Sequence, residues 1–149
     1  MKIMFDTNIL ISNFFLDAPY VESVVNKIVQ CDCEVFIDNY CLEEFGRVLG
    51  KKFFKTIGST KKWTLAYENI LDFRFKPIFS RGIELKYKTR DAKDDRILNS
   101  AILNEMDVLL TGDSDFYGCQ NEKLKVMTPR QLYDVLNNTI QNDHVGIAS

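Results

Sequence analysis

Short apolar runs alternate with helical segments along most of this chain, and this alternation limits the fold more than any other feature of the sequence. The expected strands cover residues 2–6, 33–37, 83–85, 107–111 and 125–128. The expected helices cover residues 7–16, 19–30, 39–49, 59–76 and 91–106, and a last helix begins at Pro129. Strands that alternate with helices form a parallel sheet covered on both faces. Ligands of such sheets bind at the carboxyl ends of the strands, so functional residues are expected there.

The length of 149 residues predicts one domain. We place this domain at residues 1–136 and a polar tail at residues 137–149. No apolar run approaches the roughly 18 residues that a membrane span needs, and charged residues interrupt the start where a signal peptide would be apolar. The four cysteines lack the spacing of a zinc knuckle. We therefore expect a cytoplasmic protein with reduced thiols and no contact with a membrane.

The net charge of −2 hides an uneven distribution. Residues 51–96 carry 13 Lys and Arg against 6 Asp and Glu, whereas the rest of the chain carries 6 against 15. A basic segment between acidic flanks is typical either of a solvated helical face or of a surface that binds phosphates. Lys51, Lys52 and Lys55 lie in this segment among aromatic residues. Under the second interpretation they bind the phosphates of a nucleic acid while the aromatic rings stack on unpaired bases.

Acidic residues follow two of the expected strands. Asp6 ends the first strand, and Asp113 and Asp115 come just after the strand at residues 107–111. Asp is common in surface turns, so each of these residues alone has an ordinary structural explanation. Because the carboxyl ends of parallel strands share one edge of the sheet, their coincidence favours a functional site.

The helical period separates two pairs of neighbouring acids. On the helix expected at residues 91–106, Asp94 lies in the middle of the apolar stripe and Asp95 at its edge. Glu44 borders the apolar side of its own helix, whereas Glu43 points away. Asp94 could instead be a first-turn acid that stabilises the helix dipole. An acid on the buried side of a helix start agrees better with a site over the end of the sheet, so Asp94 and Glu44 are the candidates.

Carboxylates that converge on one edge repel one another. Two unit charges about 5 Å apart cost about 3 kcal/mol at an effective dielectric constant of about 20. Such a cluster therefore needs protons or a cation, and oxygen ligands without His or Cys select Mg²⁺ or Mn²⁺. A divalent ion held by carboxylates most often serves phosphate chemistry, because it activates water and neutralises charge on the phosphoryl oxygens.

Five motifs in this order resemble those of the PIN-domain nucleases. They are FDTNILIS at residues 5–12, EFGRVL at 44–49, DAKDDRIL at 91–98, TGDSDF at 111–116 and VMTP at 126–129. The resemblance covers residues 2 to about 136 and is strongest for the bacterial branch of toxins from toxin–antitoxin pairs. It implies a three-layer α/β/α fold around a five-stranded parallel sheet.

The resemblance also implies a function. It implies Mg²⁺- or Mn²⁺-dependent cleavage of single-stranded RNA by an endoribonuclease, with an antitoxin protein and a second copy of the chain as partners. Carried over residue by residue, the catalytic metal ligands are Asp6, Glu44, Asp94 and Asp113, with Asp115 as a further acid that orients the attacking water. Asn8, Ser12 and Thr111 would lie close to the substrate, together with Lys51, Lys52 and Lys55 from the basic segment.

Two other classes of protein also fit part of the pattern. A phosphatase with an Asp nucleophile needs a second Asp two residues after the first, where this chain has Asn8, and a phospho-receiver domain needs an acidic pair and a late Lys that are not evident. A catalytically silent module that binds RNA or protein could keep the same fold, but the retention of every acid argues against it.

Overall fold

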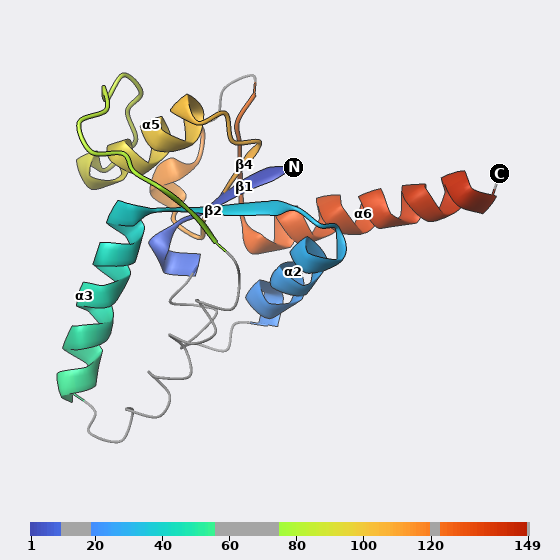
Figure 1. The fold of residues 1–149 in the computed structure, drawn as a ribbon, viewed down its shortest axis with the longest axis horizontal. Helices are drawn as coiled ribbons and strands as arrows, with labels where there is room; N and C mark the ends of the chain where they lie inside the picture. The colour runs from blue at the N-terminus through green and yellow to red at the C-terminus, as the bar shows by residue number, and fades with distance from the viewer. Residues whose placement is uncertain (10–18, 56–74, 120–122, 149) are drawn as a thin grey trace.

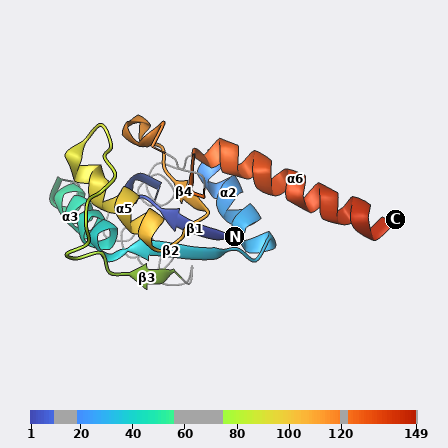
Figure 2. The same ribbon diagram turned by 90° about the horizontal axis from the view of Figure 1, so that it is seen from above.

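Five parallel strands form the centre of the structure, a computed structural model that describes residues 1–9, 19–55, 75–119 and 123–148. The strands are β1 (Lys2–Phe5), β2 (Glu34–Asp38), β3 (Lys76–Ile78), β4 (Val108–Leu110) and β5 (Lys125–Met127). Their order is β3-β2-β1-β4-β5, and each neighbouring pair is parallel. Figure 2 labels the first four strands of this order. β1 and β4 consist almost wholly of buried apolar residues, because each has a strand on both sides.

Helices cover both faces of this sheet. They are α2 (Pro19–Gln30), α3 (Asn39–Lys55), α5 (Asp95–Leu103) and α6 (Pro129–Ala148), with short 3-10 helices η1 (Ala92–Asp94) and η2 (Ser114–Phe116). Figure 1 shows α5 on one face of the strands, and α2 with the start of α6 on the other, where these two helices pack together. The expected three-layer α/β/α fold with a central five-stranded parallel sheet is confirmed.

The core connects the sheet to the elements that carry the acids. Among its largest fully buried side chains are Phe5 of β1, Leu109 of β4, Leu98 of α5 and Phe116 of η2. Each such side chain stabilises the fold by about 1.5–3 kcal/mol through its removal from water. The strand ends and the starts of α5 and η2 are therefore held at fixed positions relative to one another.

The third strand does not lie where the sequence predicts it. It covers Lys76–Ile78, whereas residues 83–85 form part of a long loop. Pro77, which we expected to end a helix, lies inside this strand opposite Ile37 of β2. β3 is an edge strand with a single neighbour, so a residue without an N–H is tolerated there.

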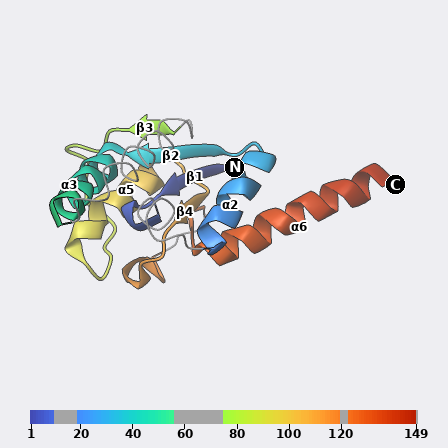
Figure 3. The same ribbon diagram turned by 90° about the horizontal axis from the view of Figure 1, so that it is seen from below.

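Two helix boundaries also differ from the prediction. The helix expected at residues 91–106 begins with η1, and the α-helical part is Asp95–Leu103. The side chain of Asp91 accepts the N–H of Lys93, which stabilises the tighter first turn. At the other end of the chain, α6 continues through residues 137–148, which we expected to be a separate polar tail. Figures 1 and 3 show this part of α6 extending away from the other elements.

Other local predictions agree with the structure. The last helix, α6, begins at Pro129 as expected, and Thr128 and Gln131 form a capping box there, because each backbone N–H donates to the other residue's side chain. All four cysteines are free thiols. Among the described residues, no helix combines the length and apolarity that crossing a membrane requires. Most of the helices expected at 7–16 and 59–76 lies outside the described residues.

Candidate functional site

The register of the sheet brings the ends of β1 and β4 together. Phe5 pairs with Leu110, and the Asp6 N–H donates to the Leu110 carbonyl oxygen at 3.0 Å. The residues that follow the two strands, Asp6 and Thr111, therefore meet at the carboxyl edge of the sheet. The Thr111 hydroxyl donates to Asp6 Oδ2 at 2.9 Å.

Asp6 is buried, with 5% of its surface exposed. Its second oxygen, Oδ1, accepts the Thr7 N–H at 2.7 Å. Burial, and to a smaller extent the negative charges of Glu44 and Asp113, raise the pKa of Asp6 to about 6, although the hydrogen bonds from Thr111 and Thr7 lower it. A carboxyl group that loses its proton so late is one whose negative charge is incompletely compensated by its surroundings.

Thr111 also fixes the loop that follows β4. Its hydroxyl oxygen accepts the Asp113 N–H at 3.0 Å, and Asp113 Oδ1 accepts the Asp115 N–H at 2.9 Å, which caps η2. Thr111 is fully buried and is engaged both as donor and as acceptor. This geometry favours a role in positioning Asp6 and Asp113 over the direct substrate contact expected from the sequence.

Asp94 lies at the meeting point of the acids. Burial raises the pKa of Asp94 to about 7, and the negative charges of four other aspartates, Asp113, Asp6, Asp91 and Asp115, act in the same direction. Its Oδ2 atom is buried and accepts no hydrogen bond from the described part of the chain. Asp94 precedes α5 but makes no side-chain capping hydrogen bond. Its carboxylate is therefore not held there by the needs of the helix.

Asp91 belongs to this group, although it is not among the site residues expected from the sequence. Ligand oxygens of Asp91, Asp94 and Asp115 lie within 4.8 Å of one another. Asp91 is also the cap of η1 and forms an ion pair with Lys93 at 3.7 Å. Its position in the DAKDD motif, three residues before Asp94, is the only signal that could have found it, because residues three apart share a helical face.

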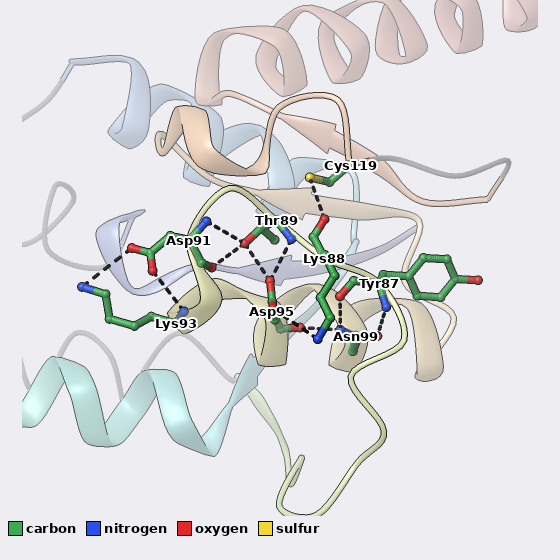
Figure 4. A network of polar contacts seen from close by, with 8 residues as sticks. All are labelled: Tyr87, Lys88, Thr89, Asp91, Lys93, Asp95, Asn99 and Cys119. Atoms are coloured by element: carbon green, nitrogen blue, oxygen red, sulfur yellow. Dashed lines mark hydrogen bonds and ion pairs between the residues drawn. The ribbon is translucent and has the colours of Figure 1, made fainter.

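The neighbouring Asp95 has the opposite environment (Figure 4). Its Oδ1 accepts the Thr89 N–H at 2.7 Å and the Thr89 hydroxyl at 2.9 Å, and its Oδ2 lies 3.7 Å from the Lys88 amine. The Thr89 N–H is the main cause that holds the pKa of Asp95 below its ordinary value, with Lys88 assisting. Asp95, which the helical period puts at the edge of the apolar stripe, is buried. Of the two adjacent acids, only Asp94 has a buried carboxylate oxygen without a described hydrogen-bond donor.

A further acid at this edge, Asp38, serves the fold. It follows Ile37, which lies opposite Phe5 of β1. One of its oxygens accepts the Tyr40 N–H at 2.8 Å at the start of α3, and the other accepts the Ser100 hydroxyl of α5 at 2.8 Å. Both oxygens are satisfied by the protein, so Asp38 connects two helices and leaves no oxygen that lacks a protein partner.

The two glutamates of α3 are separated as the helical period predicts. Glu43 is exposed and accepts a hydrogen bond from Asn39 at 3.3 Å. Glu44 is half-buried, and its charge contributes to the raised pKa of Asp6. Glu44 is therefore the glutamate of this pair that faces the strand ends.

The donor set fits a hard divalent cation. The neighbouring groups are carboxylates, and the buried Asp94 Oδ2 lacks a hydrogen-bond donor in the described part of the chain. A buried anionic oxygen needs either a proton or a cation, and oxygen ligands favour Mg²⁺ or Mn²⁺. Asp94 belongs both to the expected ligand set, with Asp6, and to the compact trio with Asp91 and Asp115.

The structure describes the side chain of only one of the remaining predicted site residues. Asn8 is exposed two residues after Asp6. Ser12 lies outside the described residues. Lys51, Lys52 and Lys55 belong to the last part of α3, but their side chains are outside the described part of the structure.

Comparison with known proteins bears on the family and the fold of this chain. A family profile described as PIN domain matches residues 2–115. No curated protein sequence matches the chain significantly. A chain in the crystal structure of VapBC2 from Rickettsia felis, bound to a DNA fragment from their promoter, has a similar fold with a TM-score of 0.64 and 16% identity. The alignment covers 86% of this chain and 98% of that one. Because the family profile spans most of its length, this chain belongs to the PIN domain family.

Proposed function

We propose that this chain is a Mg²⁺- or Mn²⁺-dependent endoribonuclease that hydrolyses phosphodiester bonds of single-stranded RNA. The observation that carries the proposal is Asp94 Oδ2, a buried oxygen without a described hydrogen-bond partner among the charges of Asp6, Asp113, Asp91 and Asp115. This arrangement in a PIN domain supports a cation site at the edge where ligands of parallel sheets bind.

The proposed ligands are Asp6, Glu44, Asp94 and Asp113, with Asp115 as a further acid at the same place. A bound divalent ion supplies the activation of water and the neutralisation of charge on the phosphoryl oxygens. The chain's own residues provide orientation. Thr111 holds Asp6 Oδ2 and the Asp113 backbone in one hydrogen-bonded arrangement, and the Asp115 carboxylate orients the attacking water.

Asp91 is a further candidate ligand beside the expected set. Its oxygen lies with those of Asp94 and Asp115 within 4.8 Å, closer than any other trio of candidate ligands among the described residues. We include it in the proposed site as a carboxylate that binds the cation directly or through water.

The proposed function is tested with the purified full chain and a mixed pool of single-stranded RNA. We expect cleavage with Mn²⁺ and none with excess chelator, because the carboxylates alone repel phosphate. Gel analysis of the products checks this. Stabilisation by Mn²⁺ without any cleavage would instead identify a silent binding module, and activity on small phosphate monoesters alone would identify a phosphatase.

The two glutamates of α3 provide an internal control. Glu44→Gln is expected to lower the rate of RNA cleavage by about 10- to 100-fold, because Glu44 faces Asp6 and supports the same site. Glu43→Gln removes the same charge from an exposed position and is expected to leave the rate within about twofold. Single-turnover cleavage by the two variants makes the comparison. Equal losses in both variants would contradict the assignment of Glu44 to the site.

We also propose partners for this activity. The resemblance of the motifs to the toxin branch implies an inhibitory antitoxin protein in the cytoplasm and a homodimer of the chain. The solved chain of similar fold comes from VapBC2 bound to promoter DNA, which supports a protein partner here as well. Co-expression with the protein encoded by the adjacent reading frame, followed by co-purification and an activity assay, tests this part of the proposal.

A further inference from the structure

A long loop begins at the carboxyl end of β3, at the same edge of the sheet as the acids. It joins β3 to η1, from residue 79 to residue 91, without a helix or strand of its own. Loops of this length inside a compact domain usually serve a function. Its residues include Phe79 and Tyr87, which are 74% and 37% exposed.

Two buried side chains of α5 hold this loop (Figure 4). Asn99 Oδ1 accepts the Tyr87 N–H at 2.9 Å, and Asn99 Nδ2 donates to the Tyr87 carbonyl oxygen at 2.8 Å. Asp95 holds Thr89 through both its N–H and its hydroxyl. These side chains satisfy backbone N–H and C=O groups of the loop, as a neighbouring strand does in a sheet. Residues 87–89 therefore have a fixed conformation.

The same loop is connected directly to the acid cluster. The Arg90 N–H donates to the Asp115 carbonyl oxygen at 3.3 Å. The Thr89 hydroxyl contacts the Asp91 carbonyl oxygen, and the Cys119 thiol contacts that of Lys88 at 3.7 Å. The backbone of residues 87–90 is therefore hydrogen-bonded to the protein, next to the acids.

The side chains of this segment other than Thr89 are exposed to solvent. Lys86, Tyr87, Lys88 and Arg90 are all exposed, and Figure 4 shows the Tyr87 ring pointing away from the hydrogen-bonded network. The Lys86 amine lies 5.6 Å from the centre of that ring. A rigid loop that presents cations and an aromatic ring beside a cluster of acids has the chemistry of a surface for unpaired nucleotides, because cations neutralise phosphates and rings stack on bases.

Resting on the nuclease function proposed above, we propose that residues 86–90 form a binding surface for single-stranded RNA beside the acid cluster. Lys86 and Arg90 contact phosphates, and Tyr87 stacks on a base. Asn99 and Asp95 are positioning residues that act through the loop backbone. The acids repel phosphate, so this surface supplies the local attraction that a chain of net charge −2 lacks overall.

The first test measures RNA affinity in the presence of chelator, so that cleavage does not enter. Fluorescence anisotropy of a short labelled RNA is followed at several salt concentrations. Lys86→Gln combined with Arg90→Gln is expected to weaken binding and to reduce the salt slope by about 1.4, since each phosphate contact on a single strand contributes about 0.7. The matched control, Lys123→Gln with Lys125→Gln, removes the same charge at the opposite edge of the sheet, where β5 begins, and is expected to keep the slope.

The second test separates stacking from charge. Tyr87→Ala is expected to weaken RNA binding by about fivefold or more, whereas Tyr87→Phe keeps the ring and is expected to bind as the unaltered chain does. Equal affinities of Tyr87→Ala and Tyr87→Phe would show that RNA binds elsewhere. Equal salt slopes of the Lys86/Arg90 double variant and the Lys123/Lys125 control would show the same. A loop variant that binds RNA normally but no longer binds a protein partner would overturn the proposal and identify a protein-docking surface.

The third test examines positioning. Asn99→Ala is expected to weaken RNA binding in the unaltered loop but to add little when Lys86, Tyr87 and Arg90 are already replaced, because it acts through them. Its stabilisation by Mn²⁺ should persist. An equal loss in both backgrounds would overturn the positioning role. The two proposals can fail separately. RNA that binds through the loop without Mn²⁺-dependent cleavage contradicts only the nuclease proposal. Mn²⁺-dependent cleavage together with normal RNA binding by the loop variants contradicts only the proposed binding surface.

Discussion

Asp94→Asn is expected to lower Mn²⁺-dependent RNA cleavage by at least about 100-fold while leaving the chain folded. Asp94 belongs to both candidate ligand groups, and its Oδ2 atom accepts no described hydrogen bond. The melting temperature without metal should hold or rise, because asparagine removes a charge that four other aspartates repel. Single-turnover cleavage and thermal melting with chelator measure the two effects.

Asp95→Asn is the matched control for this prediction. Asp95 accepts hydrogen bonds from Thr89 and pairs with Lys88, so the variant is expected to lose about 1–3 kcal/mol of unfolding free energy. Its cleavage rate should fall less than that of Asp94→Asn. A lower melting temperature for Asp94→Asn than for Asp95→Asn would mean that Asp94 is a structural cap and not a ligand. Asp6→Asn is a less clean test, because Asp6 also accepts two hydrogen bonds from the fold.

The second large effect concerns pH and metal together. The pKa values of Asp6 and Asp94 are raised from 3.8 to about 6 and about 7. At a pH between the ordinary value of 3.8 and these raised values, the folded chain therefore binds more protons than the unfolded chain. The contribution of these two groups to stability falls as the pH rises from about 4 to about 7. Without metal, the contribution of these two groups should therefore make the melting temperature lower at pH 8 than at pH 5.

Mn²⁺ should reverse this trend, because a cation and protons compete for the same oxygens. At a metal concentration of about 100 times the dissociation constant, the expected gain in unfolding free energy is about 2.7 kcal/mol. The gain should be largest at pH 8 and small at pH 5, as followed by melting with Mn²⁺ or with chelator. In Asp94→Asn the metal effect should nearly disappear. A stabilisation by Mn²⁺ that is the same at every pH and in the variant would place the cation away from these carboxylates.

The candidate site was predictable wherever a single strand or helix decides the position of a residue. The end of an apolar run placed Asp6, and the period of 3.6 residues distinguished Glu44 from Glu43. The same argument selected Asp94, which the structure surrounds with four aspartates. It did not predict the hydrogen bond from Thr89 to Asp95, because an angle around a helix axis contains no information about the loop that packs against that helix.

The sequence by itself determined the alternation of strands and helices, the capping box of α6 and the acids that follow β1 and β4. These features depend on residues a few positions apart, whose side chains interact in any context that allows a strand or a helix. Tertiary structure alone decided that Asp6 meets Thr111, that an edge strand accepts Pro77, and that Asp91 joins Asp94 and Asp115. Those outcomes depend on the register between strands and on the path of a 13-residue loop held by Asp95 and Asn99, because contacts between residues far apart in the chain form only when the whole sheet has assembled.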